Sequence, residues 1–225
     1  MYKEFLILFL IIIVHEAGHL FMALVFKWKL DKIYIYPYGG LVKFNEKINR
    51  PLREELLILI SGPLVQVILF MIITIIFRFN LISFRNYNLF KTYHYTLLLF
   101  NLLPIYPLDG GRILNILVNY LFPYKKGNKL VGLFSILVIF IGVISIKNIN
   151  LVFMSILLLF EIYKYFKDQD YLYNKLLLER YLGNYNFKRF KIINNKESMY
   201  KERRHLIKIK DKYIKEIDYL RERFR

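Results

Sequence analysis

The residues best suited to chemistry are the two histidines and the glutamate of the segment His15-Glu16-Ala17-Gly18-His19. Side chains four positions apart lie on one face of a helix, so His15 and His19 can present two imidazole nitrogens to one metal ion. Glu16 follows about 100° round the helix, where it can act as general base on a metal-bound water. Histidines that only hydrogen-bond neighbouring helices are the alternative, but they would leave Glu16 unexplained. The segment therefore predicts a hydrolytic metal site.

A catalytic zinc ion takes three protein ligands and leaves one position open for water. Asp109 is the best candidate for the third ligand, because it lies in a long apolar stretch that Pro104 and Pro107 interrupt. A membrane tolerates a broken helix only beside protein or a wet cavity, so a carboxylate there is expected to be functional. Two alternatives remain open: Asp109 as a helix N-cap, and Glu161 as the third ligand, as in a metalloprotease of another class.

Long apolar segments must position these residues. The chain has 225 residues, 56% of them hydrophobic, and residues 56–77 carry no charge. A spanning helix needs about 20 apolar residues. The sequence predicts an integral membrane protein of the all-α class with about five crossings, the third of them broken, at residues 4–27, 55–77, 93–122, 130–147 and 149–166. The chain contains no cysteine, which excludes thiolate ligands, a cysteine nucleophile and disulfides.

The composition divides the chain into a membrane-embedded domain, residues 1–166, and a basic tail, residues 167–225. The tail holds 17 of the 34 Lys and Arg but only 9 of the 17 Asp and Glu. Its apolar residues recur at three- and four-residue steps, which predicts an amphipathic helix: Leu206, Ile209, Tyr213, Ile217, Leu220 and Phe224. Such a helix can lie on the membrane, recruit a substrate or pair with a partner. No nucleic-acid-binding module is recognisable, so no direct nucleic-acid partner is expected.

Basic residues predict the orientation, because cytoplasmic loops carry an excess of Lys and Arg. The tail, the loop with Lys125, Lys126 and Lys129, and the 27–54 loop with seven Lys and Arg are therefore expected in the cytoplasm. This places the N-terminus outside. The 78–91 loop opposes this assignment, because it has three basic residues on the predicted outer side. The segments assigned to the cytoplasm hold many more basic residues, so the assignment stands.

Residues 33–45 contain two β-prone stretches around a Pro-Tyr-Gly-Gly turn, which predicts a hairpin. A hairpin at the membrane surface can pair its exposed edge with an extended substrate. An ordinary interfacial loop is the alternative.

The first motif, followed by Asn101-Leu-Leu-Pro-Ile-Tyr-Pro-Leu-Asp109-Gly110-Gly111, resembles the site-2 proteases, the zinc intramembrane metalloproteases of family M50. The resemblance covers about residues 1–166 and is closest to the branch of stage IV sporulation protein FB. It implies His15, His19 and Asp109 as zinc ligands, Glu16 as catalytic base, and Asn101 lining the active site.

Further features match the family or depart from it. Ser61-Gly62-Pro63 matches the family's small-Gly-Pro stretch on the second core helix, and the hairpin matches a re-entrant region thought to meet substrate. Gln66 stands where the family often has Asn. Sporulation members commonly begin with an extra crossing and end with a nucleotide-binding domain, which a short basic tail replaces here.

The resemblance implies a zinc-dependent intramembrane endopeptidase that works near the cytoplasmic side, on a membrane-associated pro-sigma factor in sporulation, and that inhibitory membrane partners can gate. Cleavage of another membrane-anchored regulator, such as an anti-sigma factor or a signal-peptide remnant, is an alternative. A metal transporter is a further alternative function. A transporter would be expected to show paired broken helices in two related halves, whereas this sequence shows a single broken helix. An inactive scaffold would be expected to lose Glu16 or a ligand.

Overall fold

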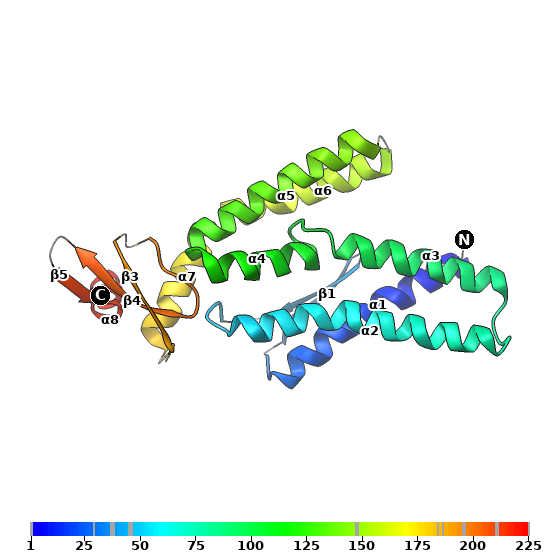
Figure 1. The fold of residues 1–225 in the computed structure, drawn as a ribbon, viewed down its shortest axis with the longest axis horizontal. Helices are drawn as coiled ribbons and strands as arrows, with labels where there is room; N and C mark the ends of the chain where they lie inside the picture. Colours follow the sequence, from blue (N-terminus) through cyan, green and yellow to red (C-terminus); the bar gives the residue numbers. More distant parts are fainter. Residues whose placement is uncertain are drawn as a thin grey trace. The chain divides into compact units, whose positions relative to one another are not determined.

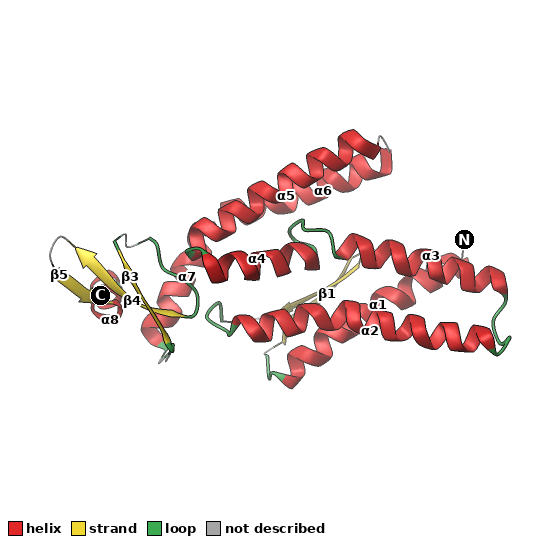
Figure 2. Ribbon diagram, in the orientation of Figure 1, coloured by secondary structure: helices red, strands yellow, loops and turns green. Residues whose placement is uncertain are grey.

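The computed structural model describes a mostly helical chain with two small sheets (Figures 1 and 2). The described residues are 2–28, 30–36, 39–44, 47–146, 149–183, 185, 187–194, 197–209 and 212–224. The chain divides into two compact units. The first comprises residues 1–46 and 53–103, and the second comprises residues 47–52 and 104–225.

The first unit contains α1 (Tyr2–Val25), the strands β1 (Leu30–Tyr36) and β2 (Gly39–Phe44), α2 (Leu52–Arg78) and α3 (Phe84–Asn101). Helix α1 contacts α3 and β2. The strands β1 and β2 pair antiparallel, so the hairpin expected over residues 33–45 is present as backbone structure. Its turn at residues 37–38 lies outside the described residues.

Within the described residues, four helices are long and apolar enough to cross a membrane: α1, α2, α5 (Tyr124–Ile146) and α6 (Ile149–Lys167). This supports a membrane protein. The predicted third crossing over residues 93–122 is not one long helix. It consists of the end of α3, a non-helical segment over residues 102–108 and the helix α4 (Asp109–Leu121). The break predicted within the third crossing is therefore present, and the count of five crossings stays a prediction.

In the second unit, α4 packs on α5 and α5 packs on α6. A small apolar core of Ile105, Ile139 and Ile162 joins the non-helical segment to both long helices. This packing fixes the segment that leads into Asp109.

The C-terminal part corrects the prediction of a helical tail. Helix α7 (Gln169–Leu182) is followed by β3 (Arg189–Ile193), β4 (Arg203–Ile209), β5 (Lys212–Lys215) and α8 (Glu216–Arg223). Strand β4 lies between β3, which is parallel to it, and β5, which is antiparallel. We call residues 169–224 the C-terminal module.

Burial explains why the helix prediction for the tail is wrong. His205 and Ile207 of β4 are buried, whereas Arg204 and Lys208 are exposed. This alternation has the period of a strand rather than that of a helix. The apolar side chains of the module form one core, which includes Leu176, Leu177, Met199, Ile207 and Leu220. The all-α class therefore fails for this part of the chain.

Candidate metal centre

The two motif histidines are buried on one face of α1. His15 is 4% exposed and His19 is 8% exposed. Their rings meet edge to face with centroids 4.8 Å apart. The two Nε2 atoms face each other at 3.1 Å. The four-residue spacing therefore brings the two imidazoles together as the helical period requires.

Each histidine uses its other ring nitrogen to bind an acceptor on α2. His15 Nδ1 donates to Gln66 Oε1 at 2.9 Å, and His19 Nδ1 donates to the Ile58 carbonyl at 2.7 Å. These acceptors assign the proton of each neutral ring to Nδ1, so both Nε2 atoms present lone pairs.

Two lone pairs that face each other repel unless a cation lies between them. Zinc binds imidazole nitrogen at about 2.0–2.1 Å with tetrahedral angles, which places two ligand nitrogens roughly 3.3 Å apart. The observed Nε2 separation of 3.1 Å is close to that value. The pair therefore fits a zinc ion, and its donor atoms are of the type that zinc prefers.

Gln66 is the partner that orients His15, a role that the sequence did not reveal. Its side chain is fully buried, and its Nε2 donates to the His94 carbonyl at 3.0 Å. His94 is itself buried, with its ring stacked on Phe70 at 4.4 Å. The amide is held from both sides, so its oxygen stays directed at His15. An amide within an otherwise apolar helix was the available signal.

Small residues let α1 and α2 approach closely enough for these bonds. A Cβ on Gly18 would lie 2.7 Å from the Ser61 carbonyl oxygen, and a Cβ on Gly62 would overlap the His19 ring. The Ser61 hydroxyl also lies 2.9 Å from the Gly18 carbonyl, to which it donates. The Ser61-Gly62 pair thus places α2 directly against the motif.

Two further predicted site residues belong to the same unit. Glu16 is partly buried on the same turn of α1 as the histidines. Asn101, the last residue of α3, places its side-chain nitrogen 3.4 Å from His15 Nε2. The first unit therefore brings His15, His19 and Asn101 together.

Asp109 lies in the second unit, as the first residue of α4, and it is 9% exposed. The N-cap position belongs to Leu108, so capping does not account for the Asp109 carboxylate. The preceding backbone is fixed by a bond of 3.0 Å from the Tyr106 N–H to the Ser135 hydroxyl on α5. A Cβ on Gly111 would overlap the backbone of residues 105 and 106, so glycine allows this close approach.

The other candidate ligands have other partners. Glu161 is partly exposed and forms an ion pair with Lys164 at 2.8 Å. His205 lies in the C-terminal module, where its Nδ1 donates to Glu216 at 2.9 Å. Neither arrangement is that of a zinc ligand, and this leaves Asp109 as the carboxylate to consider.

Comparisons with known proteins bear on this site. Residues 3–96 match the family model described as Peptidase family M50. Stage IV sporulation protein FB of Bacillus subtilis (strain 168) is 32% identical over 190 residues, 80% of this chain and 65% of that protein. A zinc metalloprotease of Methanocaldococcus jannaschii is 34% identical over 163 residues, 69% of this chain and 47% of that protein. The chain thus spans less than two thirds of the length of either relative.

A solved structure is also similar. The site-2 protease from Methanocaldococcus jannaschii has 29% sequence identity and a TM-score of 0.58, over 73% of this chain and 77% of that one.

Proposed function

The chain carries a site-2 protease domain of peptidase family M50, and from this premise we propose that it is a zinc-dependent intramembrane endopeptidase. The observation that carries the proposal is the approach of the two Nε2 lone pairs, of His15 and His19, to 3.1 Å. Asp109 would be the third ligand. All three side chains are buried and each offers one ligand atom, which is the ligand number of catalytic zinc.

The remaining chemistry falls to Glu16 and Asn101. When bound, zinc would lower the pKa of a water molecule to about 7 and polarise the scissile carbonyl. Glu16 would accept the proton that the attacking water loses and pass it to the leaving amine. Asn101 lies beside His15, where its amide can donate a hydrogen bond to the substrate.

The substrate would enter from the cytoplasmic side. Helix α1 ends at Val25, nine residues beyond Glu16, which is about 14 Å along the helix axis. By the excess of Lys and Arg expected in cytoplasmic loops, the 27–54 loop and the C-terminal module would lie in the cytoplasm, with the N-terminus outside. An unwound substrate segment would pair with the β1–β2 hairpin by strand addition.

The substrate we propose is a membrane-associated pro-sigma factor processed in sporulation, on the strength of the similarity to stage IV sporulation protein FB. Another membrane-anchored regulator, such as an anti-sigma factor or a signal-peptide remnant, would suit the same chemistry. Inhibitory membrane partners would regulate access. A metal transporter is the remaining alternative, and it would bind metal without cleaving any peptide.

Co-expression with a candidate pro-sigma factor tests the proposal, with cleavage and zinc content measured in parallel. We expect Glu16→Gln to abolish cleavage and retain zinc, whereas Asp109→Asn loses zinc. Glu161→Gln serves as the control because Glu161 is a carboxylate on α6 with its own ion-pair partner. It should keep both zinc and cleavage. Loss of zinc in Glu161→Gln but not in Asp109→Asn would assign the third ligand to Glu161. Full cleavage by Glu16→Gln would refute the mechanism.

A further inference from the structure

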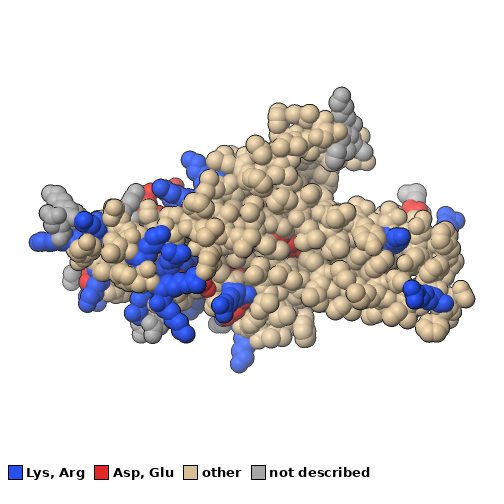
Figure 3. Space-filling view, in the orientation of Figure 1, with Lys and Arg blue, Asp and Glu red and all other residues tan. Residues whose placement is uncertain are grey.

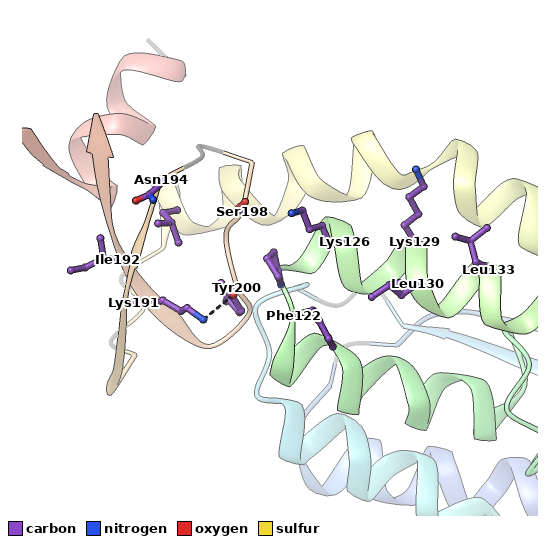
Figure 4. Close-up of a pocket in the computed structure, with 12 residues that line it drawn as sticks. Phe122, Lys126, Lys129, Leu130, Leu133, Lys191, Ile192, Asn194, Ser198 and Tyr200 are labelled. Carbon is purple, nitrogen blue, oxygen red and sulfur yellow. Dashed lines mark hydrogen bonds between the residues drawn. The ribbon is translucent and has the colours of Figure 1, made fainter. Parts of the chain in front are cut away.

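A second feature, within the second unit and distinct from the histidine motif, is a pocket of about 630 Å³ between the start of α5 and strand β3 (Figure 4). Its walls combine cations with apolar side chains. Those that matter here are Lys126, Lys129, Leu130 and Leu133 of α5, and Lys191 and Ile192 of β3.

The charged side chains that line this pocket are all positive. None of the described residues that line it is acidic. Lys126 and Lys129 are exposed, and within the described part of the chain no ion pair is recorded for either. Lys191 is held in place, since its Nζ donates to the Tyr200 hydroxyl at 2.9 Å and lies 4.2 Å from the centre of that ring (Figure 4). The Lys191 amine is thus directed at Tyr200, and the amines of Lys126 and Lys129 on the α5 wall are the ones that suit an anion (Figure 4).

The apolar wall continues beyond the pocket along α5. Leu130 and Leu133 are about half exposed, and the same face continues with further exposed side chains at three- and four-residue steps: Leu137, Phe140, Ile141 and Ile144. Helix α5 is one of the helices suited to crossing a membrane. Its lysines therefore lie at the boundary between water and hydrocarbon, where long basic side chains reach toward headgroups. Figure 3 shows Lys and Arg gathered near the C-terminal module and the adjoining end of the α5–α6 pair, whereas most of the rest of that pair is tan on this face.

We propose that this pocket binds the headgroup of an anionic phospholipid, with the acyl chains lying against the exposed stripe of α5. The phosphate would meet Lys126 and Lys129. A free phosphate compound would use the amines and leave the stripe unused. An acidic peptide or a nucleic acid would do the same, so the combination of amines and a membrane-facing stripe favours the lipid.

The bound lipid would contact two parts of the second unit at once. One wall of the pocket belongs to the membrane helix α5 and the other to β3 of the C-terminal module. The lipid would thus fasten the module to the bilayer surface, with a strength that depends on the anionic lipid content of the membrane.

Native mass spectrometry of the full chain in neutral detergent tests this proposal, by titration with phosphatidylglycerol or phosphatidylcholine. We expect saturable retention of phosphatidylglycerol alone. Lys126→Gln/Lys129→Gln should weaken it on the order of tenfold or more, because each basic side chain at an anionic surface contributes roughly a factor of five. Lys212→Gln/Lys215→Gln is the matched control, since it removes the same charge from exposed positions of β5 outside the pocket. It should stay within about twofold of wild type.

Three results would overturn the assignment. Equal retention by wild type and Lys126→Gln/Lys129→Gln would place the lipid elsewhere. An equal loss in the control variant would indicate a general effect of charge. Displacement of the lipid by an equal concentration of glycerol phosphate would identify a site for soluble phosphates, with the acyl chains irrelevant.

Discussion

At the scale of single residues, the tautomer of the His15 ring depends on Gln66. The Gln66 oxygen accepts the His15 Nδ1 proton, which leaves the Nε2 lone pair available for a metal. The partner of a ligating histidine fixes its tautomer and ring orientation and raises its basicity. Gln66 is fully buried and anchored to the His94 carbonyl, so it would influence a bound metal through His15.

Gln66→Leu should therefore weaken zinc binding by about 10- to 100-fold, the usual cost of losing such a partner. Titration of the purified protein with a zinc chelator measures this effect. Gln66→Glu keeps an acceptor oxygen and should restore most of the affinity. If Gln66→Leu and Gln66→Glu lose zinc equally, Gln66 supports only the packing of α2 and does not orient His15.

At the scale of elements, the contact between α1 and α2 depends on glycine. A methyl group on Gly62 would overlap the His19 ring, and overpacking of this kind costs typically 1–3 kcal/mol. Gly62→Ala should displace His19, reduce zinc content and lower the thermal stability of the protein. Gly142→Ala is the control, because nothing lies within 4 Å of its added methyl group. Zinc content near the wild-type level in Gly62→Ala would show that the helices can separate without moving the ligand.

Elements differed in how far the sequence could predict them. The paired histidines follow from a spacing of four residues within one helix, and this local geometry is fully determined by the helical period. The hairpin was predictable from its β-prone stretches and its turn residues. The role of Gln66 was not, because it arises from a contact between residues that lie 51 positions apart. Asp109 was indicated by the two prolines that interrupt its apolar stretch, and its role as the third ligand stays a prediction.

The tail shows why a pattern of apolar residues can mislead. Steps of three and four from Leu206 to Phe224 fitted a helix, yet β4 ends at Ile209 and β5 begins at Lys212. Buried His205 and Ile207 carry the strand period, and only the surrounding core reveals which apolar residues face inward. Tertiary packing therefore overrode the helical pattern.

At the scale of the whole molecule, the C-terminal module holds the segment that joins the hairpin to α2. The Arg180 Nε donates to the Asn49 side-chain oxygen at 2.7 Å, and the Glu179 carboxylate accepts from the Asn49 N–H at 3.1 Å. The N–H of Leu52, the first residue of α2, donates to Glu202 at 2.7 Å. The module therefore packs with residues 47–52 within the second unit.

A buried ionic network lies inside this module. Arg180 is paired with Glu216 at 2.7 Å, and Glu216 also accepts from His205 Nδ1 at 2.9 Å. His205 Nε2 accepts from the Tyr200 N–H at 2.9 Å, so the imidazole is neutral and both nitrogens are used. Burial is the largest cause that lowers the pKa of His205; Glu216 opposes it, and the nearby charges of Arg180 and Arg203 add to it. Burial alone would raise the pKa of Glu216, but His205 and Arg180 together hold it below its usual value.

These shifts predict that acid loosens the module. The unfolded chain protonates His205 near pH 6.5, whereas the folded module resists protonation. The contribution of His205 to stability is therefore complete above about pH 6.5 and is lost as the pH falls toward the lowered pKa of the folded state. The lowered pKa of Glu216 acts in the same direction, but only below pH 4.5. A loss of stability of the module between pH 7.5 and 5.5 is therefore attributed to protonation of His205.

Hydrogen exchange of the β4 amides, corrected for the intrinsic effect of pH, measures this loss in the full chain. We expect corrected exchange to accelerate between pH 7.5 and 5.5, by up to about tenfold for each unit by which folding lowers the pKa. His205 is the one histidine of the C-terminal module, so His205→Asn should exchange faster at pH 7.5 but show almost no dependence on pH in this range. If corrected exchange in the wild type does not change with pH, or if His205→Asn keeps the wild-type dependence on pH, another group controls the response of the module to acid.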